Sequence, residues 1–318
     1  MTTNLTHDVA IIGGGAAGLS AAVALARSLR SVVLVDAGEP RNKPATGAHN
    51  VLGREGISPL ELLAAGRGEA ERYGADIRQD RAVAARRIDG GFEVDLAGRG
   101  AVRARRLLLA TGLVDELPDV PGVRELWGTS VLHCPYCHGW EVRGQRIGVL
   151  GTSPNSIHQA LLFRQLSENV TLFRHTMPEL DAQTRDQLAA LDIEVVDGSI
   201  RQLRGEAGLV PAGGVRAVVL EDGREFPVDA VAVAPRFMAR ADLFEQLGGV
   251  LTEHLFGAFI EAYPKGATAI PGVWAAGNAS DLTAMITAAT AAGVVAGAAI
   301  NADLVTEDAN AAVRAARS

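Results

Sequence analysis

Near its N-terminus the chain reads Asp8-Val9-Ala10-Ile11-Ile12-Gly13-Gly14-Gly15-Ala16-Ala17-Gly18, followed by an Ala- and Leu-rich stretch and an apolar run that ends at Asp36. This order predicts a strand, a glycine turn, a helix and a second strand, which is the context of the dinucleotide-binding pattern Gly13-x-Gly15-x-x-Gly18. The glycines let the backbone approach a pyrophosphate, and the helix N-terminus offers unpaired N–H groups. Asp36 stands where a carboxylate accepts hydrogen bonds from ribose hydroxyls.

A second, altered copy of this unit begins at the strand 146–150. Its turn reads Gly151-Thr152-Ser153-Pro154-Asn155-Ser156, so that Ser153 and Ser156 stand where the later glycines would be, and Pro154 removes a backbone donor. The strand 170–173 that follows ends without an acid, at Arg174-His175. The architecture repeats, but the sequence predicts a degenerate nucleotide site.

The composition indicates an α/β protein of two domains. The chain has 318 residues, which is ample for two domains, and its 36 glycines suit tight turns between strands and helices. A formal net charge of −7 leaves no surplus of cations to neutralise a nucleic acid or an anionic membrane. With only 4% aromatic residues, base-stacking surfaces are also disfavoured. We therefore expect no nucleic-acid partner and no membrane partner.

Three features bear on the location of the chain. Cys134 and Cys137 are the only cysteines, so there is no scattered disulfide framework and we expect a cytoplasmic protein. The first Lys or Arg is Arg27, so the N-terminus lacks the charged region of a signal peptide. The uncharged stretch 282–300 is rich in Ala, Gly and Thr, which predicts a buried helix rather than a membrane span.

Further strands are predicted from apolar runs and their bounding turns. A long strand closes on Ala110-Thr111-Gly112, and another precedes the turn at Gly277. The runs 215–220 and 228–233 flank Asp222-Gly223 and are expected to form a strand pair. Residues 309–318 are expected to form a frayed, solvated tail.

The pair Cys134-Pro135-Tyr136-Cys137 carries the chemistry. Zinc would need two further ligands that the sequence does not place at the usual spacing, so we expect no metal. Covalent haem attachment, formally matched by Cys134-x-x-Cys137-His138, belongs to exported proteins, and a buried structural pair of thiols is a further alternative. A redox dithiol is favoured, because a dinucleotide site that could hold a flavin accompanies the pair.

These motifs together resemble the low-molecular-weight thioredoxin reductases, and the resemblance covers nearly the whole chain. It implies two Rossmann-like domains: an FAD domain at 1–117 plus 241–318, and an inserted NAD(P)H-type domain at 118–240 that carries the CxxC. A homodimer is implied as well. The residues then expected to bind FAD are Gly13, Gly15, Ala16, Ala17, Gly18, Asp36, Ala37, Asn50, Val83, Thr111, Gly112, Gly277, Asn278, Met285 and Ile286.

The chain departs from the reductase pattern beside the cysteines. Thioredoxin reductases carry an Asp after the second cysteine, where this chain has His138, and their Gly-Asp at the FAD end is Gly277-Asn278 here. The stretch 134–141, CPYCHGWE, looks instead like the dithiol oxidase branch, which closes the disulfides of gliotoxin- and holomycin-type natural products. This likeness predicts Cys134 as the sulfur that exchanges with substrate and Cys137 as the flavin-side sulfur.

The sequence thus predicts an FAD-dependent dithiol oxidase that passes electrons from a small-molecule dithiol to O2. His138 is the candidate base, because imidazole titrates near neutral pH; the alternative is an ordinary hydrogen-bonding histidine. One rival function is an NADPH-dependent disulfide reductase with a thioredoxin-like protein as partner. Another is a flavin-binding redox sensor that does not turn over dithiols.

Overall fold

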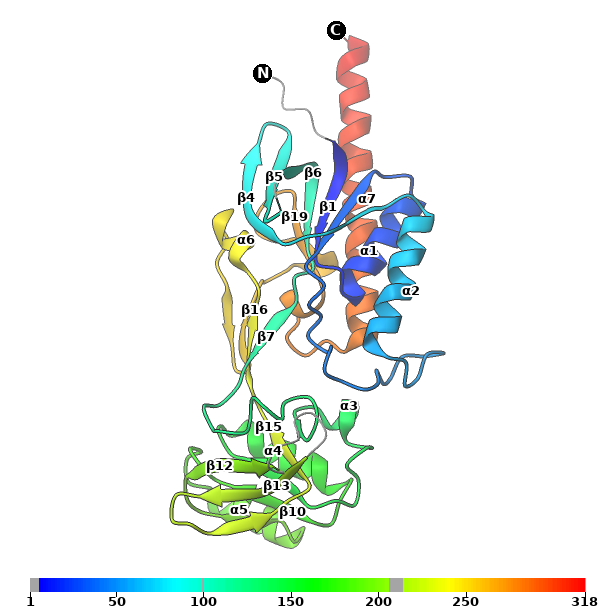
Figure 1. Ribbon diagram of the computed structural model, residues 1–318. Coiled ribbons are helices and arrows are strands. Elements are labelled where there is room, and N and C mark those ends of the chain that lie inside the picture. The colour runs from blue at the N-terminus through cyan, green and yellow to red at the C-terminus, as the bar shows by residue number, and fades with distance from the viewer. Residues whose placement is uncertain (1–5, 99, 206–213, 318) are drawn as a thin grey trace. The chain divides into compact units, whose positions relative to one another are not determined.

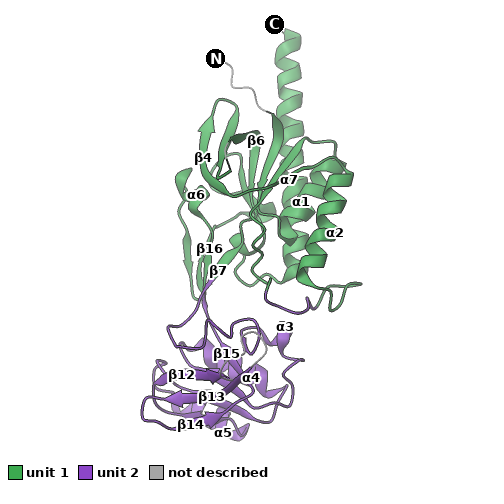
Figure 2. Cartoon of the chain, in the orientation of Figure 1, with its two compact units in different colours: residues 1–43, 50–114, 237–318 green, residues 44–49, 115–236 purple. Residues whose placement is uncertain are grey.

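The structure, a computed structural model, describes residues 6–98, 100–205 and 214–317. The chain divides into two compact units (Figure 2). Unit 1 contains residues 1–43, 50–114 and 237–318, and unit 2 contains residues 44–49 and 115–236. The chain passes from unit 1 to unit 2 within the strand β7 (Leu113–Glu116) and returns within the strand β16 (Arg236–Ala239). Both points lie slightly earlier than the expected domain boundaries after residues 117 and 240. The short segment 44–49 joins unit 2, which no sequence pattern indicated.

A seven-stranded sheet forms the centre of unit 1, in the order β3-β2-β1-β6-β5-β4, and β19 also pairs with β6. Its strands are β1 (His7–Ile12), β2 (Val32–Asp36), β3 (Asp76–Gln79), β4 (Ala82–Ile88), β5 (Gly91–Leu96), β6 (Ala101–Leu109) and β19 (Val273–Ala275). The pairs among β3, β2, β1, β6 and β19 are parallel, and β4, β5 and the start of β6 are antiparallel. Because β1 and β2 are covered on both faces, they read as nearly continuous apolar runs.

Three helices pack along one face of this sheet: α1 (Ala16–Arg27), α2 (Pro59–Arg72) and α7 (Ile286–Arg317) (Figure 1). Small residues allow α7 to lie against α1. A Cβ built at Gly293 would stand 2.0 Å from the carbonyl oxygen of Ala17, and one at Gly297 would stand 3.1 Å from that of Ala21. Glycine is therefore required at Gly293 by the contact between the two helix backbones.

Helix α7 is longer and more exposed than the sequence predicted. Among the described residues it is the one helix whose length and composition would suit a membrane span, but core helices pass the same test, and Ala289, Ala296 and Ile300 bury one face of it in unit 1. Its other face carries exposed valines. The expected tail at 309–318 is wrong as far as Arg317, because the helix continues that far. Before residue 309 the helix is anchored to β6, because Oδ2 of Asp303 lies 2.6 Å from Nε of Arg106.

The remaining parts of unit 1 extend from these layers. A four-stranded sheet has the order β17-β18-β16-β7, so it includes the two strands in which the chain passes between the units, β7 and β16. Its other members are β17 (Thr252–His254) and β18 (Gly257–Phe259), and the short helices nearby in sequence are α6 (Asp242–Gln246), η1 (Pro264–Gly266) and η2 (Gly277–Ala279).

Unit 2 contains a five-stranded parallel sheet in the order β11-β10-β9-β15-β8 and a three-stranded antiparallel sheet in the order β12-β13-β14. The strands of the parallel sheet are β8 (Val131–Leu132), β9 (Ile147–Leu150), β10 (Val170–Phe173), β11 (Glu194–Val196) and β15 (Ala230–Val233). The antiparallel strands are β12 (Ile200–Gly205), β13 (Val215–Leu220) and β14 (Glu225–Pro227), and the helices are α3 (Pro135–His138), α4 (Asn155–Arg164) and α5 (Ala182–Ala190).

The expected pairing of 215–220 with 228–233 is wrong. The hairpin around Asp222-Gly223 joins β13 to β14, and the chain then leaves the hairpin so that β15 can enter the parallel sheet beside β9. All four residues of β15 are buried, which explains the apolar run. The predicted α/β class with parallel sheets is confirmed in both units.

Candidate active site

The three glycines of the first turn have different surroundings. A Cβ built at Gly13, where φ is +107°, would stand 2.3 Å from the carbonyl oxygen of Ala110, and one at Gly18 would stand 1.9 Å from that of Gly13. Both glycines are therefore fixed by the packing of β1, α1 and β6. A Cβ at Gly15 meets no protein atom within 4 Å. The space in front of Gly15 is thus left open by the fold.

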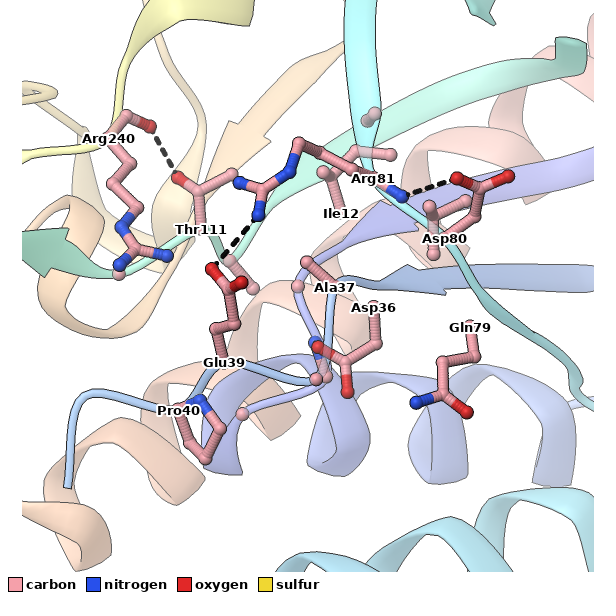
Figure 3. Close-up of a pocket in the computed structure, with 18 of the residues that line it drawn as sticks. Ile12, Asp36, Ala37, Glu39, Pro40, Gln79, Asp80, Arg81, Thr111 and Arg240 are labelled. Atoms are coloured by element: carbon pink, nitrogen blue, oxygen red, sulfur yellow. Dashed lines mark hydrogen bonds and ion pairs between the residues drawn. The ribbon is translucent and has the colours of Figure 1, made fainter. Parts of the chain in front are cut away.

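That open space belongs to a pocket of about 900 Å³ in unit 1, within the range of cofactor sites (Figure 3). It lies at the ends of β1, β2 and β6, where ligands bind in doubly wound sheets. The predicted residues that line it are Gly13, Gly15, Asp36, Ala37, Val83, Thr111, Gly112 and Asn278. The predicted residues outside its lining are Ala16, Ala17, Gly18, Asn50, Gly277, Met285 and Ile286.

Asp36 lies at the end of β2 and faces the glycine turn. Its carboxylate accepts a hydrogen bond from the N–H of Gly14 at 3.2 Å and lies 3.7 Å from the guanidinium of Arg67. Figure 3 shows the side chain beside the turn, with Ala37 next to it. The carboxylate has further lone pairs, so it can also accept from hydroxyl groups of a ligand.

The pocket wall also carries a set of charged residues that no sequence pattern indicated. Glu39 pairs with Arg81 at 3.0 Å, and this guanidinium lowers the pKa of the Glu39 carboxyl (Figure 3). Arg240 is held through its backbone: its carbonyl accepts from the Thr111 hydroxyl at 2.6 Å, and its N–H donates to Gly112 at 2.9 Å. These residues come from loops and strand ends far apart in the chain, where no spacing pattern indicates them.

The predicted residues outside the lining belong to the elements around the pocket. Ala16 begins α1, and Ile286 begins α7 directly after Met285. Ala17, Gly18 and Gly277 pack the elements around the turn: a Cβ at Gly277 would stand 2.9 Å from Cβ of Ala17. Asn50 lies at the first turn of α7, where its carbonyl accepts from the Thr287 hydroxyl at 2.7 Å.

Asn278 explains why an amide replaces the acid expected from reductases. Its Nδ2 donates to the carbonyls of both Asp281 and Ala284 at 3.0 Å. A carboxylate could accept here but could not donate. The amide therefore holds the loop that leads into α7, and Asn278 also lines the pocket.

The CxxC forms the one-turn helix α3 in unit 2. Cys134 precedes the helix in an extended conformation, Pro135 occupies its first position, and the N–H groups of Cys137 and His138 donate to the carbonyl of Cys134 at 3.2 and 3.1 Å. Both cysteines are half-buried. This turn places the two cysteines three residues apart on one helical turn, the spacing of a redox pair.

Helix α4 supports the CxxC turn through the side chain of Gln159. The amide of Gln159, which is buried, donates to the carbonyls of His133 at 2.7 Å and Val233 at 3.2 Å. The residue before Cys134 is thereby tied to the end of β15. His138 follows the cysteines, and its buried Nε2 has no hydrogen-bond partner among the described residues. Burial lowers the pKa of His138, so the imidazole is neutral at pH 7.

Comparison with known proteins adds the family. The family model described as pyridine nucleotide-disulphide oxidoreductase matches residues 7–293. The chain belongs to this family. It is therefore a thioredoxin reductase-like flavoprotein and an oxidoreductase that acts on sulfur groups, which confirms the resemblance drawn from the motifs.

Individual members of the pyridine nucleotide-disulphide oxidoreductases align over most of the chain. The thioredoxin reductase tcpT of Claviceps purpurea is 34% identical, covering 93% of this chain and 94% of its own. The thioredoxin reductase of Bacillus subtilis is 28% identical, covering 87% and 88%. The crystal structure of HlmI superposes with a TM-score of 0.90 at 43% identity, covering 98% of this chain and 96% of that one.

In this pyridine nucleotide-disulphide oxidoreductase, the second turn is filled by its own side chains. Ser156 is fully buried; its hydroxyl donates to the carbonyl of Leu150 at 3.3 Å and accepts from the N–H of Thr152 at 3.2 Å. The N–H of Thr152, which begins the turn, is thereby engaged within the protein. A third glycine would have left this space open.

The two basic side chains that follow β10 are also engaged within unit 2. Arg174 forms an ion pair with Asp197. Nδ1 of His175 accepts from the N–H of Ile200 at 3.0 Å, and burial lowers the pKa of His175, so it is uncharged at neutral pH. The charge of Arg174 is therefore balanced by Asp197, and His175 adds no positive charge at neutral pH.

Proposed function

We propose that this flavoprotein is a dithiol oxidase: it closes a disulfide in a small-molecule dithiol and transfers the two electrons to O2, which gives H2O2. The observation that carries the proposal is the contrast between the two turns. The turn of unit 1 opens onto a pocket at Gly15, whereas the turn of unit 2 is closed by Ser156. A chain that keeps the redox cysteines without a good pyridine nucleotide site needs a dithiol as its electron donor.

The pocket of unit 1 fits FAD. The open approach at Gly15 suits a pyrophosphate, the carboxylate of Asp36 suits ribose hydroxyls, and the guanidinium of Arg240 adds positive charge. Oδ1 of Asn278 would accept from a hydroxyl of the ligand. When bound, FAD supplies the two-electron acceptor that hands electrons from the cysteine pair to O2.

The residues of unit 2 carry out the thiol chemistry. Neutral His138 takes the proton of a substrate thiol, and the thiolate attacks Cys134 of the oxidised Cys134–Cys137 pair, which releases Cys137 as a thiolate. The second substrate thiol then displaces Cys134, which leaves with the proton of that thiol, and the substrate disulfide closes. The substrate loses two electrons, and the cysteine pair gains them.

The wider assignments follow from the same proposal. The discontinuous unit 1, rather than the inserted unit, would hold FAD, together with Asn50, Met285 and Ile286 at the first turn of α7. The remaining partners are a small dithiol and O2, within a cytoplasmic homodimer. The names of the relatives favour the alternative, an NADPH-dependent reductase of a thioredoxin-like protein.

Oxygen consumption tests the proposal. With dithiothreitol as the probe, the purified yellow protein should consume one O2 and form one H2O2 per disulfide closed, without NADPH. Cys134→Ser and Cys137→Ser should each keep the flavin and lose turnover, because one sulfur cannot complete the exchange. The proposal fails if dithiothreitol supports no oxygen uptake while NADPH and a thioredoxin give rapid disulfide reduction.

A further inference from the structure

Three titratable side chains gather beside the CxxC in unit 2. His138 ends α3, Glu141 lies in the turn that follows, and His49 comes from the segment 44–49, about ninety residues earlier in the chain. Nε2 of His49 lies 3.5 Å from a carboxylate oxygen of Glu141. Figure 2 shows the segment 44–49 in the colour of unit 2, separate in sequence from the rest of that unit.

The segment 44–49 is held within unit 2 by packing. A Cβ built at Gly128 would stand 2.7 Å from Cβ of Pro44, and Ala48 is buried. His49 is thus presented to Glu141 by a packed segment. Its side chain is 24% exposed and that of Glu141 is 42% exposed, so this pair reaches water, whereas Nε2 of His138 is buried.

The three groups are electrically coupled. Burial lowers the pKa of His138, the carboxylate of Glu141 raises it, and the nearby His49 lowers it. Two imidazoles therefore compete for one carboxylate. The charges that act on His138 are those of Glu141 and His49. The thiols of Cys134 and Cys137 belong to its own turn and His133 precedes that turn, while on the supporting helix α4 Gln159 is uncharged and His158 is exposed.

We propose that Glu141 and His49 are positioning residues that control the proton taken up by His138: Glu141 balances the charge on His138, and His49 competes for that carboxylate. The inference rests on the dithiol oxidation proposed above. In the step concerned, the S–H bond of the substrate breaks, the proton goes to His138, and the electron pair stays on sulfur for the attack on Cys134. The solvent-exposed pair of Glu141 and His49 then gives the proton a route to water.

The proposal predicts opposite effects from two substitutions. Glu141→Gln removes the charge that favours the imidazolium, so the pKa of His138 should fall by about 0.5 unit, the size expected for a partly exposed pair. His49→Gln removes the imidazole that competes for Glu141, so the pKa of His138 should rise by about as much. Glu141→Asp keeps the negative charge, so the pKa of His138 in this variant should be closer to that of the parent than to that of Glu141→Gln.

NMR titration of the oxidised holoprotein, labelled with ¹⁵N-histidine and free of substrate, measures this pKa directly. His138→Gln assigns the resonance. Glu168→Gln and His158→Gln are matched controls on exposed positions of unit 2, and both should leave the pKa of His138 unchanged. In parallel, the pH dependence of anaerobic flavin reduction by dithiothreitol should shift in the same directions as the pKa.

The outcomes separate this inference from the proposed function. Equal pKa values in Glu141→Gln, His49→Gln and the controls would overturn the inference even in an active oxidase, and so would shifts of the same sign. If the opposite pKa shifts appear but dithiothreitol reduces the flavin of neither the parent protein nor any variant, the dithiol oxidase proposal fails. The role of His138, Glu141 and His49 in substrate deprotonation is then overturned with it.

Discussion

Gly15 is the residue at which cofactor binding can be separated from folding. Its φ of −79° is open to any amino acid, and an added Cβ meets no protein atom. Gly15→Val should therefore fold with little change in melting temperature yet lose its flavin, because the side chain enters the approach of the pyrophosphate. The ratio of flavin to protein absorbance and a thermal melt measure the two effects.

Gly18→Ala is the matched control for this prediction. Its Cβ would stand 1.9 Å from a backbone oxygen, so the substitution should lower the free energy of unfolding by about 1–3 kcal/mol. A Gly15→Val protein that remains fully yellow would show that the open side of the turn is not where the ligand's phosphates lie.

The pH dependence of dithiol oxidation tests His138 as the base. Burial lowers its pKa from 6.5, so the imidazole is neutral and able to accept a proton at pH 7, where a free thiol with a pKa of about 8.5 is still protonated. His138→Ala should slow flavin reduction by dithiothreitol about 10²-fold at pH 7, and the loss should shrink towards pH 9. A loss of the same size at every pH would assign His138 a structural role instead.

At the residue scale, the sequence could predict the members of the site that belong to a local pattern. Gly15 and Asp36 belong to the dinucleotide pattern and line the pocket. Arg81 and Arg240 were missed because one lies in a connection between strands and the other is held by a hydrogen bond to Thr111, 129 positions away. Such contacts arise from the tertiary fold and leave no periodic signal in the chain.

At the element scale, the contact of α7 with α1 depends on Gly293. Gly293→Ala should destabilise the protein by about 1–3 kcal/mol, because the added Cβ would stand 2.0 Å from the carbonyl oxygen of Ala17. Gly68→Ala, in the exposed face of α2 with no atom within 4 Å of its Cβ, should stabilise by about 0.5–1 kcal/mol. Denaturant unfolding of the holoprotein compares them. Equal effects would contradict the close approach of the two helices.

The two wrong predictions of secondary structure, the hairpin arm at 228–233 and the tail at 309–318, have physical explanations. The strand β15 lies only two residues after β14, so its apolar run looked like the second arm of a hairpin, but full burial on both faces suits a parallel sheet. The end of α7 lacks an apolar core face and looked like a tail. Its Ala-rich composition sustains the helix, and ion pairs of Asp303 and Glu307 with Arg106 anchor its middle.

In the molecule as a whole, the strand–turn–helix architecture occurs twice, once in each unit, but among the described residues only the turn of unit 1 opens onto a pocket. The turn of unit 1 keeps three glycines and opens onto a large pocket, while the turn of unit 2 is occupied by Ser156. Beside the second turn, Arg174 is paired with Asp197 and the neutral His175 accepts from Ile200. The sequence could predict the repeat and the loss of glycines. It could not predict that the segment 44–49 joins unit 2 and brings His49 to Glu141, because this depends on packing between distant segments.

The source of electrons is the most direct test of the account. The oxidised protein is mixed without oxygen, in separate experiments, with NADPH and with dithiothreitol, and the flavin absorbance is followed. NADPH should leave the flavin band nearly unchanged over minutes, whereas dithiothreitol should bleach it, and air should restore the colour with formation of H2O2. Rapid bleaching by micromolar NADPH would contradict the account and favour a disulfide reductase.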